Sequence, residues 1–383
     1  MTEVDTVGLR AAFVAGYSFD LDDFQLRGLD AIDAGASVLV AAPTSSGKTV
    51  VAEYALQKAL HEGTKAFYTT PIKALSNQKY ADLVRRHGAG RVGLLTGDNA
   101  INGEAPIVVM TTEVLRNMIY AASDTLRDLR YIILDEVHYL QDTYRGPVWE
   151  EVIIHAPHSA RLVCLSATVS NAEELADWMT TVRGPTSTII EERRPVELQN
   201  LYLVGDRSAD RLHLLPTLID NRPNPEASRL DAEAVRGARP MRGRGRRRLY
   251  TPRRVEVVEL LEESAMLPSI YFIFSRAACS DAAAACLDAG LRLTTAAERD
   301  RIREIVGARL RGIDDADLAV LGYARWLAGL EAGVAPHHAG LVPPFKEAVE
   351  ACFVEGLVKV VFATETLALG INMPARSVVI EKL

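Results

Sequence analysis

Between Ala41 and Leu56 the chain reads AAPTSSGKTVVAEYAL, a short apolar run followed by a loop of small residues and a helix-forming segment. The loop ends in Gly47, Lys48 and Thr49. Backbone N–H groups at a helix N-terminus, a lysine and a magnesium-binding hydroxyl are the groups that hold phosphate in such loops. The glycine that usually opens the pattern is Ala42 here, so the loop alone also fits a Ser/Gly turn that caps a helix.

Short apolar runs rich in β-branched residues alternate with helical segments along the first half of the chain. This alternation predicts a parallel sheet with helices on both faces, in which ligands bind beyond the carboxyl ends of the strands. Polar clusters follow nearly every run: PTSSGKT, TTP, TGD, TTE, DEVH and SAT. The runs are SVLVAAP, KAFYTTP, RVGLLTG, PIVVMTT, RYIILDE and RLVCLSAT, and the helical segment TVVAEYALQKALHEG ends at Gly63.

An acidic pair, Asp135 and Glu136, follows the run YIIL and is therefore expected at a strand tip. Nucleotide hydrolysis needs one carboxylate to hold Mg²⁺ and a second to orient or deprotonate the attacking water. By itself the pair also fits a solvated strand end. Together with the loop at Lys48 it predicts a hydrolase of ATP or GTP.

Composition limits the class of protein. A chain of 383 residues, 48% of them hydrophobic, suggests two or three domains. No unbroken apolar run approaches the ~20 residues of a membrane span, and the N-terminus MTEVDTVGLR lacks the apolar core of a signal peptide. We therefore expect a cytoplasmic protein without membrane contact. Its four cysteines lack C-x-x-C spacing and are expected to be buried thiols: Cys164, Cys279, Cys286 and Cys352.

The strand and helix pattern breaks after Pro195 and resumes near residue 255 with SIYFIFS, VKVVFATE and SVVIEKL. The sequence therefore predicts an α/β protein with two parallel-sheet domains in tandem. We expect a first domain at 1–195, a flexible Arg-rich linker or insertion at 196–254, and a second domain at 255–383. Because the chain stops after a strand-like run without a closing helix, the second domain is expected to be incomplete.

Charge is distributed unevenly along the chain. The formal net charge is −7, but nine arginines and no acids lie between Arg236 and Arg254, which leaves −16 for the rest. This Arg-rich ribbon fits two roles equally well. It is either a polyanion-binding element, because guanidinium groups pair with phosphates, or a solvated linker.

Several longer motifs carry a resemblance to a known family. The chain resembles superfamily 2 helicases of the superkiller-like branch, which includes exosome-associated RNA helicases and bacterial HelY-type proteins. Ala at the position of Ala42 is ordinary in that branch. The resemblance covers most of the chain except the Arg-rich ribbon and residues 287–332. The motifs are FDLDDFQ, APTSSGKT, PIKALSNQKY, TTEVLR, DEVHYLQDTYRGPVWEE, LSATVSNAEELADWM, VAPHHAGL and FATETLALGINMPA.

The resemblance implies two RecA-like domains that bind ATP and Mg²⁺ and assigns roles to individual residues. Lys48 would contact the β- and γ-phosphates, Phe19 would stack on the adenine, and Gln25 would read it. Thr49 and Asp135 would hold Mg²⁺, the latter through water, while Glu136 would act as general base. The implied ATP-binding set is Phe19, Gln25, Thr44, Ser45, Ser46, Gly47, Lys48, Thr49, Gly370 and Asn372.

Other implied residues couple ATP to nucleic acid. His138 would sense the γ-phosphate together with Ser166, Ala167 and Thr168. The implied nucleic-acid contacts are Pro71, Lys73, Thr112, Glu113, Ser275, His338 and Thr364. Structural roles also fit some of these, since Thr112 or Ser275 can cap a helix and His338 can be a hydrogen-bonded core histidine.

The implied mechanism is ATP-driven closure of a cleft between the domains, with 3′-to-5′ movement along single strands and RNA as the commoner substrate. We expect a monomer that works with RNA-processing or RNA-degradation machinery. A DNA helicase and an ATP-gated RNA-binding clamp remain alternatives. Residues 371–383 contain only Arg376, whereas the family places two arginines in a later motif. We therefore expect this chain to bind ATP, hydrolyse it feebly and not unwind duplexes.

Overall fold

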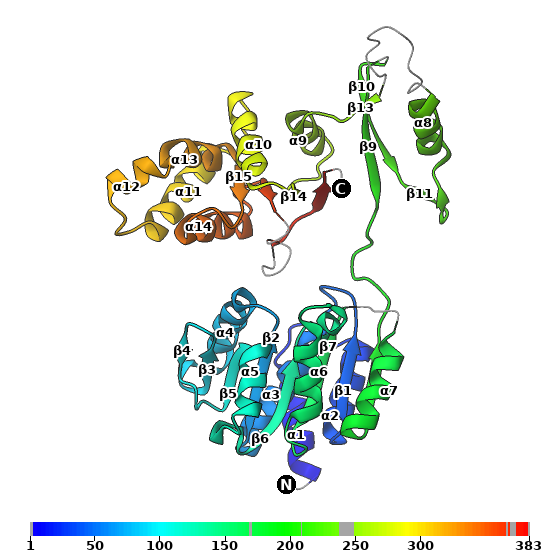
Figure 1. Ribbon diagram of the computed structural model, residues 1–383, viewed down its shortest axis with the longest axis vertical. Helices are drawn as coiled ribbons and strands as arrows, with labels where there is room; N and C mark the ends of the chain where they lie inside the picture. Colours follow the sequence, from blue (N-terminus) through cyan, green and yellow to red (C-terminus); the bar gives the residue numbers. More distant parts are fainter. Residues whose placement is uncertain are drawn as a thin grey trace. The chain divides into compact units, whose positions relative to one another are not determined.

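The computed structural model describes two compact units of the chain, Met1–Glu197 and Leu198–Leu383 (Figure 1). The sequence-based boundary at residue 195 lies close to this division. All four cysteines are buried. The described residues are 3–167, 171–207, 209–236, 249–364, 367 and 373–381.

Unit 1 is built on an eight-stranded sheet with the strand order β4-β3-β5-β2-β6-β7-β1-β8. All neighbours pair in parallel except β3 and β4. Six of these strands are the runs predicted from the sequence, so the α/β parallel-sheet fold is confirmed. The strands are β1 (Ser37–Ala41), β2 (Lys65–Thr70), β3 (Val92–Leu95), β4 (Ala100–Ile101), β5 (Ile107–Thr111), β6 (Leu129–Leu134), β7 (Arg161–Ser166) and β8 (Thr186–Ile190).

Helices cover both faces of this sheet because successive strand residues point to opposite sides. Val38 and Val40 lie in one core with α1 to α4, whereas Leu39 lies in the other with α5 to α7. The predicted helix α3 ends where expected, at Gly63, which has a φ of 66°. The helices are α1 (Glu3–Ala15), α2 (Asp23–Asp33), α3 (Thr49–Glu62), α4 (Lys73–His87), α5 (Thr112–Tyr120), α6 (Gly146–His155) and α7 (Ala172–Arg183).

Unit 2 contains a four-stranded, fully parallel sheet in the order β15-β16-β14-β17. Three strands match the predicted runs: β14 (Ser269–Phe272), β16 (Val360–Ala363) and β17 (Ser377–Ile380). The fourth, β15 (Val334–His337), was not predicted, because VAPH is short and contains a proline.

Helices also cover both faces of the second sheet. Helices α9 and α10 share a core with Tyr271 and Phe362, whereas α11, α13 and α14 share the other with Ile270 and Val361. Helix α11 buries Ile302, Ile305 and Val306 in the second of these cores. The helices are α9 (Arg254–Glu263), α10 (Arg276–Asp288), α11 (Ala296–Arg309), α12 (Asp315–Val320), α13 (Tyr323–Ala332) and α14 (Pro343–Val354).

Residues 196–254, for which the sequence predicts a flexible linker, form several elements that belong to unit 2. Strands β9 (Leu201–Asp206) and β10 (Arg211–Pro216) pair antiparallel over six residues each, and β13 (Leu249–Tyr250) pairs with β9. The short strands β11 (Leu218–Ile219) and β12 (Arg222–Pro223) form a hairpin before α8 (Pro225–Arg236). Cross-strand pairing, which apolar periodicity does not reveal, accounts for the difference. Residues 237–248, the centre of the Arg-rich ribbon, lie outside the described residues.

Within the part of the chain that the structure describes, no helix combines the length and apolar character that crossing a membrane requires.

Two helical glycines test the packing directly. A Cβ at Gly28 would lie 2.6 Å from a methyl carbon of Val51, where α2 meets α3. Gly28→Ala is therefore expected to lower the free energy of unfolding of unit 1 by about 1–3 kcal/mol in urea titrations. Gly307→Ala in α11 meets nothing within 4 Å and should stabilise unit 2 by up to ~1 kcal/mol. A Gly28→Ala protein as stable as wild type would contradict the α2–α3 packing.

Candidate functional site

The small-residue loop runs from the end of β1 to the start of α3 and has a constrained backbone. Gly47 has a φ of 82°, and a Cβ there would lie 2.6 Å from Nε2 of Gln25. Lys48, which is 8% exposed, immediately precedes α3. The Ser46 hydroxyl is buried and has no hydrogen-bond partner among the described residues. A helix N-terminus with a lysine and an unpartnered hydroxyl is suited to bind an anion.

Gln25 ties the preceding segment to this loop. Its side chain is buried, its Oε1 accepts a hydrogen bond from the Asp22 backbone at 2.9 Å, and its Nε2 donates to the Gly47 carbonyl at 3.0 Å. Phe19 is 54% exposed and contacts the ring of Tyr17. Of the two residues expected to bind the base, Gln25 is therefore held against the phosphate loop, and Phe19 precedes Gln25 by six residues.

The acidic pair lies at the tip of β6, as predicted. Glu136 has φ 52° and ψ 44°, a left-handed conformation that is uncommon outside glycine. One oxygen of Asp135 accepts a hydrogen bond from the Glu136 backbone at 2.9 Å, and the other accepts one from the Tyr68 hydroxyl at 2.7 Å. Tyr68, a residue that sequence reasoning missed, is fully buried in β2. Burial, followed by the charge of Asp135, raises the pKa of Tyr68, so it remains a donor.

The electrostatics of the site favour a basic Glu136 and a neutral His138. Burial raises the pKa of Glu136, and the neighbouring Asp135 raises it further, while Lys48 and Lys79 oppose the shift. Burial, with Lys48 as the second cause, lowers the pKa of His138. The Nδ1 atom of His138 lies 3.2 Å from a Glu136 carboxylate oxygen without forming a hydrogen bond. A carboxylate with a raised pKa is a better proton acceptor than an ordinary one.

Strand β7 places Ser166 beside the phosphate loop. Ser166 pairs with Ala41 in the parallel register, and its carbonyl accepts a hydrogen bond from the Ala42 backbone at 3.1 Å. Its hydroxyl is buried without a partner among the described residues. Ala167 follows the strand, and Thr168 lies outside the described residues. Of the three predicted coupling residues, Ser166 therefore adjoins the loop, and Ala167 follows Ser166 directly in sequence.

The predicted nucleic-acid residues of unit 1 follow β2 and β5 at the same sheet edge. Lys73 is exposed at the start of α4 and forms an ion pair with Asp98 at 3.0 Å. Pro71 is buried and Glu113 is half-buried in the first turn of α5. Thr112 is buried, and its hydroxyl donates to the Thr70 carbonyl at 3.3 Å. Thr112 therefore has a structural role, although it does not cap a helix.

Three predicted residues of unit 2 follow β14, β15 and β16 at one edge of the second sheet. Ser275 caps α10 by accepting a hydrogen bond from the Ala278 backbone at 3.4 Å. His338 is buried, with Nε2 3.1 Å from the Ser280 hydroxyl and Nδ1 accepting from the Gly340 backbone at 3.1 Å. Thr364 is half-buried directly after β16. Ser275 and His338 thus fill structural roles, and Gly370 and Asn372 lie outside the described residues.

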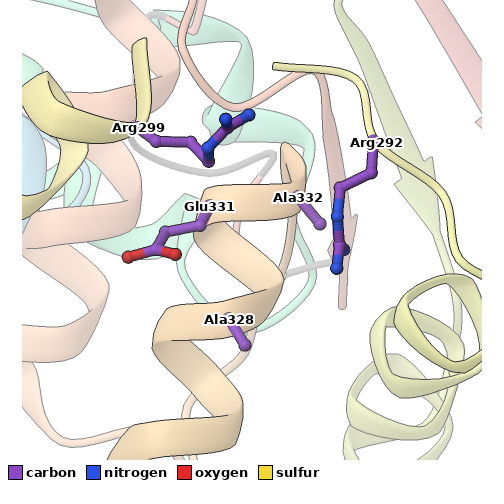
Figure 2. Close-up of a pocket in the computed structure, with 5 residues that line it drawn as sticks. All are labelled: Arg292, Arg299, Ala328, Glu331 and Ala332. Carbon is purple, nitrogen blue, oxygen red and sulfur yellow. The ribbon is translucent and has the colours of Figure 1, made fainter. Parts of the chain in front are cut away.

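A hollow of about 430 Å³ in unit 2 is lined by none of the predicted site residues (Figure 2). It borders the amino end of β15, whereas ligands of parallel sheets bind at carboxyl ends. We therefore do not assign the candidate site to it. Its lining residues are Arg292, Arg299, Ala328, Glu331 and Ala332.

The residues at the unit 1 edge fit a magnesium ion better than a transition metal. The described residues contain no cluster of three or more His, Cys, Asp or Glu side chains that could hold a metal by themselves. Mg²⁺ instead takes one or two carboxylates, waters and substrate phosphates. Asp135 and the Thr49 hydroxyl would supply oxygen ligands of this kind, and the hydroxyls of Ser46 and Ser166 are buried without a partner among the described residues.

Comparison with known proteins gives related sequences. Residues 22–175 match the DEAD/DEAH box helicase family. The probable helicase HelY of Mycobacterium leprae is 52% identical over 386 residues, covering 97% of this chain and 42% of that protein. Human superkiller complex protein 2 is 40% identical over 387 residues, covering 96% and 30%. The ATP-dependent RNA helicase mtr4 of Schizosaccharomyces pombe is 38% identical over 385 residues, covering 95% and 33%.

Among solved structures, helicase Lhr of Mycobacterium smegmatis, described as bound to ssDNA and AMP-PNP, has a similar fold. Its TM-score is 0.59 at 24% identity, over 96% of this chain and 42% of that one. At this identity the likeness supports the fold alone, two RecA-like domains in tandem. The chain spans about two-fifths of the length of HelY and a third or less of the other two relatives.

The Tyr68 hydrogen bond predicts a defined loss of metal affinity. Tyr68→Phe keeps the ring in the core but removes a bond that orients Asp135, so Mg²⁺-dependent binding of a fluorescent ATP analogue should weaken about tenfold. Binding of the same analogue in EDTA should not change. Tyr54→Phe, which removes a hydroxyl bonded to Asp33 instead, serves as the matched control. Equal Mg²⁺ dependence in Tyr68→Phe and wild type would show that Tyr68 does not orient Asp135.

Proposed function

We propose, since the chain belongs to the DEAD/DEAH box helicases of the superkiller-like branch of superfamily 2, that it is an ATP-dependent helicase that moves 3′ to 5′ on single-stranded RNA. ATP would close its two RecA-like units on the strand, and hydrolysis would release them. We further propose that it acts as a monomer in the cytoplasm, together with RNA-processing or RNA-degradation machinery.

One observation carries this proposal: the phosphate loop, the acidic pair and Ser166 come together at the carboxyl edge of one parallel sheet. Ala42 is bonded to Ser166, and Lys48 lies close enough to Glu136 and His138 to shift the pKa of both. A buried lysine beside a half-buried carboxylate of raised pKa and a half-buried neutral histidine suits hydrolysis of a phosphoanhydride.

Each side chain then has a role in the proposed reaction. Lys48 would neutralise the β- and γ-phosphates, and Glu136 would accept a proton from the attacking water. Mg²⁺, held by Thr49 and by Asp135 through water, would neutralise phosphate charge when bound. His138, whose lowered pKa keeps it uncharged, would report the γ-phosphate by hydrogen bonding rather than by charge.

One feature supports RNA as the strand: the relative mtr4 is named an ATP-dependent RNA helicase. Lys73, exposed at the start of α4 beside the predicted strand contacts, offers a cation to the phosphates of either nucleic acid. Contacts of this kind address the phosphate backbone, so binding should depend on salt and little on sequence.

The deciding experiment measures ATP turnover with single-stranded RNA, single-stranded DNA or neither. Weak stimulation by RNA is expected of this chain, without displacement of a strand from a duplex with a 3′ overhang, because residues 371–383 contain only Arg376 where the family uses two arginines. Stimulation by DNA alone would indicate a DNA helicase. RNA stimulation without displacement in a protein that also carries the two family arginines would instead indicate an ATP-gated clamp. ATP binding is measured in parallel, so that a slow basal rate does not hide an intact site.

Lys48→Ala tests the phosphate site. The substitution removes the positive charge that would neutralise the β- and γ-phosphates and leaves the fold intact. Nucleotide turnover should therefore fall to background in a protein with a wild-type circular dichroism spectrum. Near-normal turnover in the folded variant would refute the assignment of Lys48.

Glu136→Gln separates binding from chemistry. The amide keeps the shape and a hydrogen bond but loses the base, so the variant should bind ATP with Mg²⁺ normally and turn it over at least ~100-fold more slowly. If affinity collapses while the rate per bound ATP is preserved, Glu136 is a metal ligand and not the base.

A further inference from the structure

A cluster of aromatic and charged residues lies beside the predicted base-binding residue Phe19. Its members are Phe13, Tyr17, Glu53 and Arg86, called the Tyr17 cluster below. The Tyr17 ring lies between its neighbours, with centroids 5.3 Å from buried Phe13 and 5.2 Å from Phe19, at interplanar angles of 72° and 60°. Of the three rings, Phe19 is the most exposed and Phe13 is buried in the core. Tyr17 contacts both and so connects Phe19 to the core.

Polar contacts fix the orientation of Tyr17. Its hydroxyl donates to Glu53 at 2.6 Å and accepts from Arg86 at 3.0 Å, and Arg86 also forms an ion pair with Glu53. The guanidinium of Arg86 lies 5.1 Å from the centroid of the Tyr17 ring. Burial and Glu53 raise the pKa of Tyr17, so its hydroxyl remains a donor. Two side chains, Glu53 and Arg86, therefore hold the Tyr17 ring in place.

These partners come from elements that already serve the candidate site. Glu53 lies on α3, one turn after Thr49, and Arg86 lies in the last turn of α4. Side chains four residues apart lie on the same face of a helix, so Glu53 connects the Tyr17 ring to the helix whose N-terminus follows the phosphate loop. The cluster fixes Phe19 relative to the phosphate-binding residues and not merely to the nearest strand.

We propose that Tyr17, held by Glu53 and Arg86, is a positioning residue that presents Phe19 to the base of a bound adenine nucleotide. The proposal rests on the function proposed above and deepens it. An aromatic ring stacks well on a base only at a restricted distance and tilt. Phe19 is largely exposed, and its packing against Tyr17 supplies that restriction. The cluster therefore determines the contribution of the base to nucleotide affinity. It does not change the contribution of the phosphates.

The test compares ligands with and without a base. Dissociation constants for ADP and for inorganic tripolyphosphate are measured by calorimetry, with Mg²⁺, on the 383-residue chain. Tyr17→Leu and Arg86→Met should weaken ADP binding about tenfold and change tripolyphosphate binding less than twofold. Tyr17→Phe keeps the ring and should weaken ADP binding about threefold. Arg85→Met is the matched control, because Arg85 is adjacent to Arg86 but pairs only with Asp82 among the described residues.

A second readout separates positioning from general loss of structure. Where turnover is measurable, KM for ATP should rise in Arg86→Met and Tyr17→Phe while kcat stays at the wild-type value. Unchanged ADP affinity in these two variants would overturn the proposal, even if Tyr17→Leu fails to fold. A parallel loss of ADP and tripolyphosphate binding would also overturn it, because it would show that the cluster only supports the phosphate loop. If wild-type protein binds neither ligand, the proposed function itself fails.

Discussion

Parallel pairing of the central strands of unit 1 is the constraint on which the candidate site depends. It brings the carboxyl ends of β5, β2, β6, β7 and β1 to one edge of the sheet. Residues just beyond one strand donate hydrogen bonds to carbonyls at the end of the neighbouring strand: the Ala42 amide to Ser166, the Asp135 amide to Thr69, and the Thr112 hydroxyl to Thr70. Each loop therefore begins at a fixed position relative to the neighbouring strand. A one-residue slip of any of these strands would turn its loop away from the others.

The site is also a place where the chain tolerates strain. A left-handed backbone at a non-glycine residue such as Glu136 costs on the order of 1–3 kcal/mol and persists only where the surroundings fix it. Here the Glu136 amide donates a hydrogen bond to the Asp135 carboxylate, which also accepts one from the hydroxyl of buried Tyr68 in the neighbouring strand. The same contacts that stabilise the strained residue orient the two carboxylates differently. One faces its hydrogen-bond donors, while the other lies near Lys48 and His138 with a raised pKa.

The sequence predicts most strands of both sheets because buried parallel strands are continuous apolar runs between turn residues. Strand β8, half-buried at the sheet edge, and the proline-containing β15 lack that signal, and the β9–β10 pair depends on cross-strand contacts. The phosphate-binding role of the loop could be predicted from the sequence because Gly47, Lys48 and Thr49 are contiguous. The roles of Tyr68 and Tyr17 could not be predicted, since their partners Asp135 and Glu53 lie 67 and 36 residues away along the chain. Only the fold shows those pairs.

The central claim is that the edge of unit 1 binds nucleotide and that this binding is coupled to a nucleic-acid strand. Linkage tests it most directly, because two coupled ligands must change each other's affinity by the same factor. The dissociation constant of a fluorescent single-stranded RNA is measured with and without saturating non-hydrolysable ATP, and that of the nucleotide with and without saturating RNA. The account predicts one common factor of roughly 5 to 150 in both directions. An RNA affinity that the nucleotide does not change, together with a nucleotide affinity that RNA does not change, would contradict it.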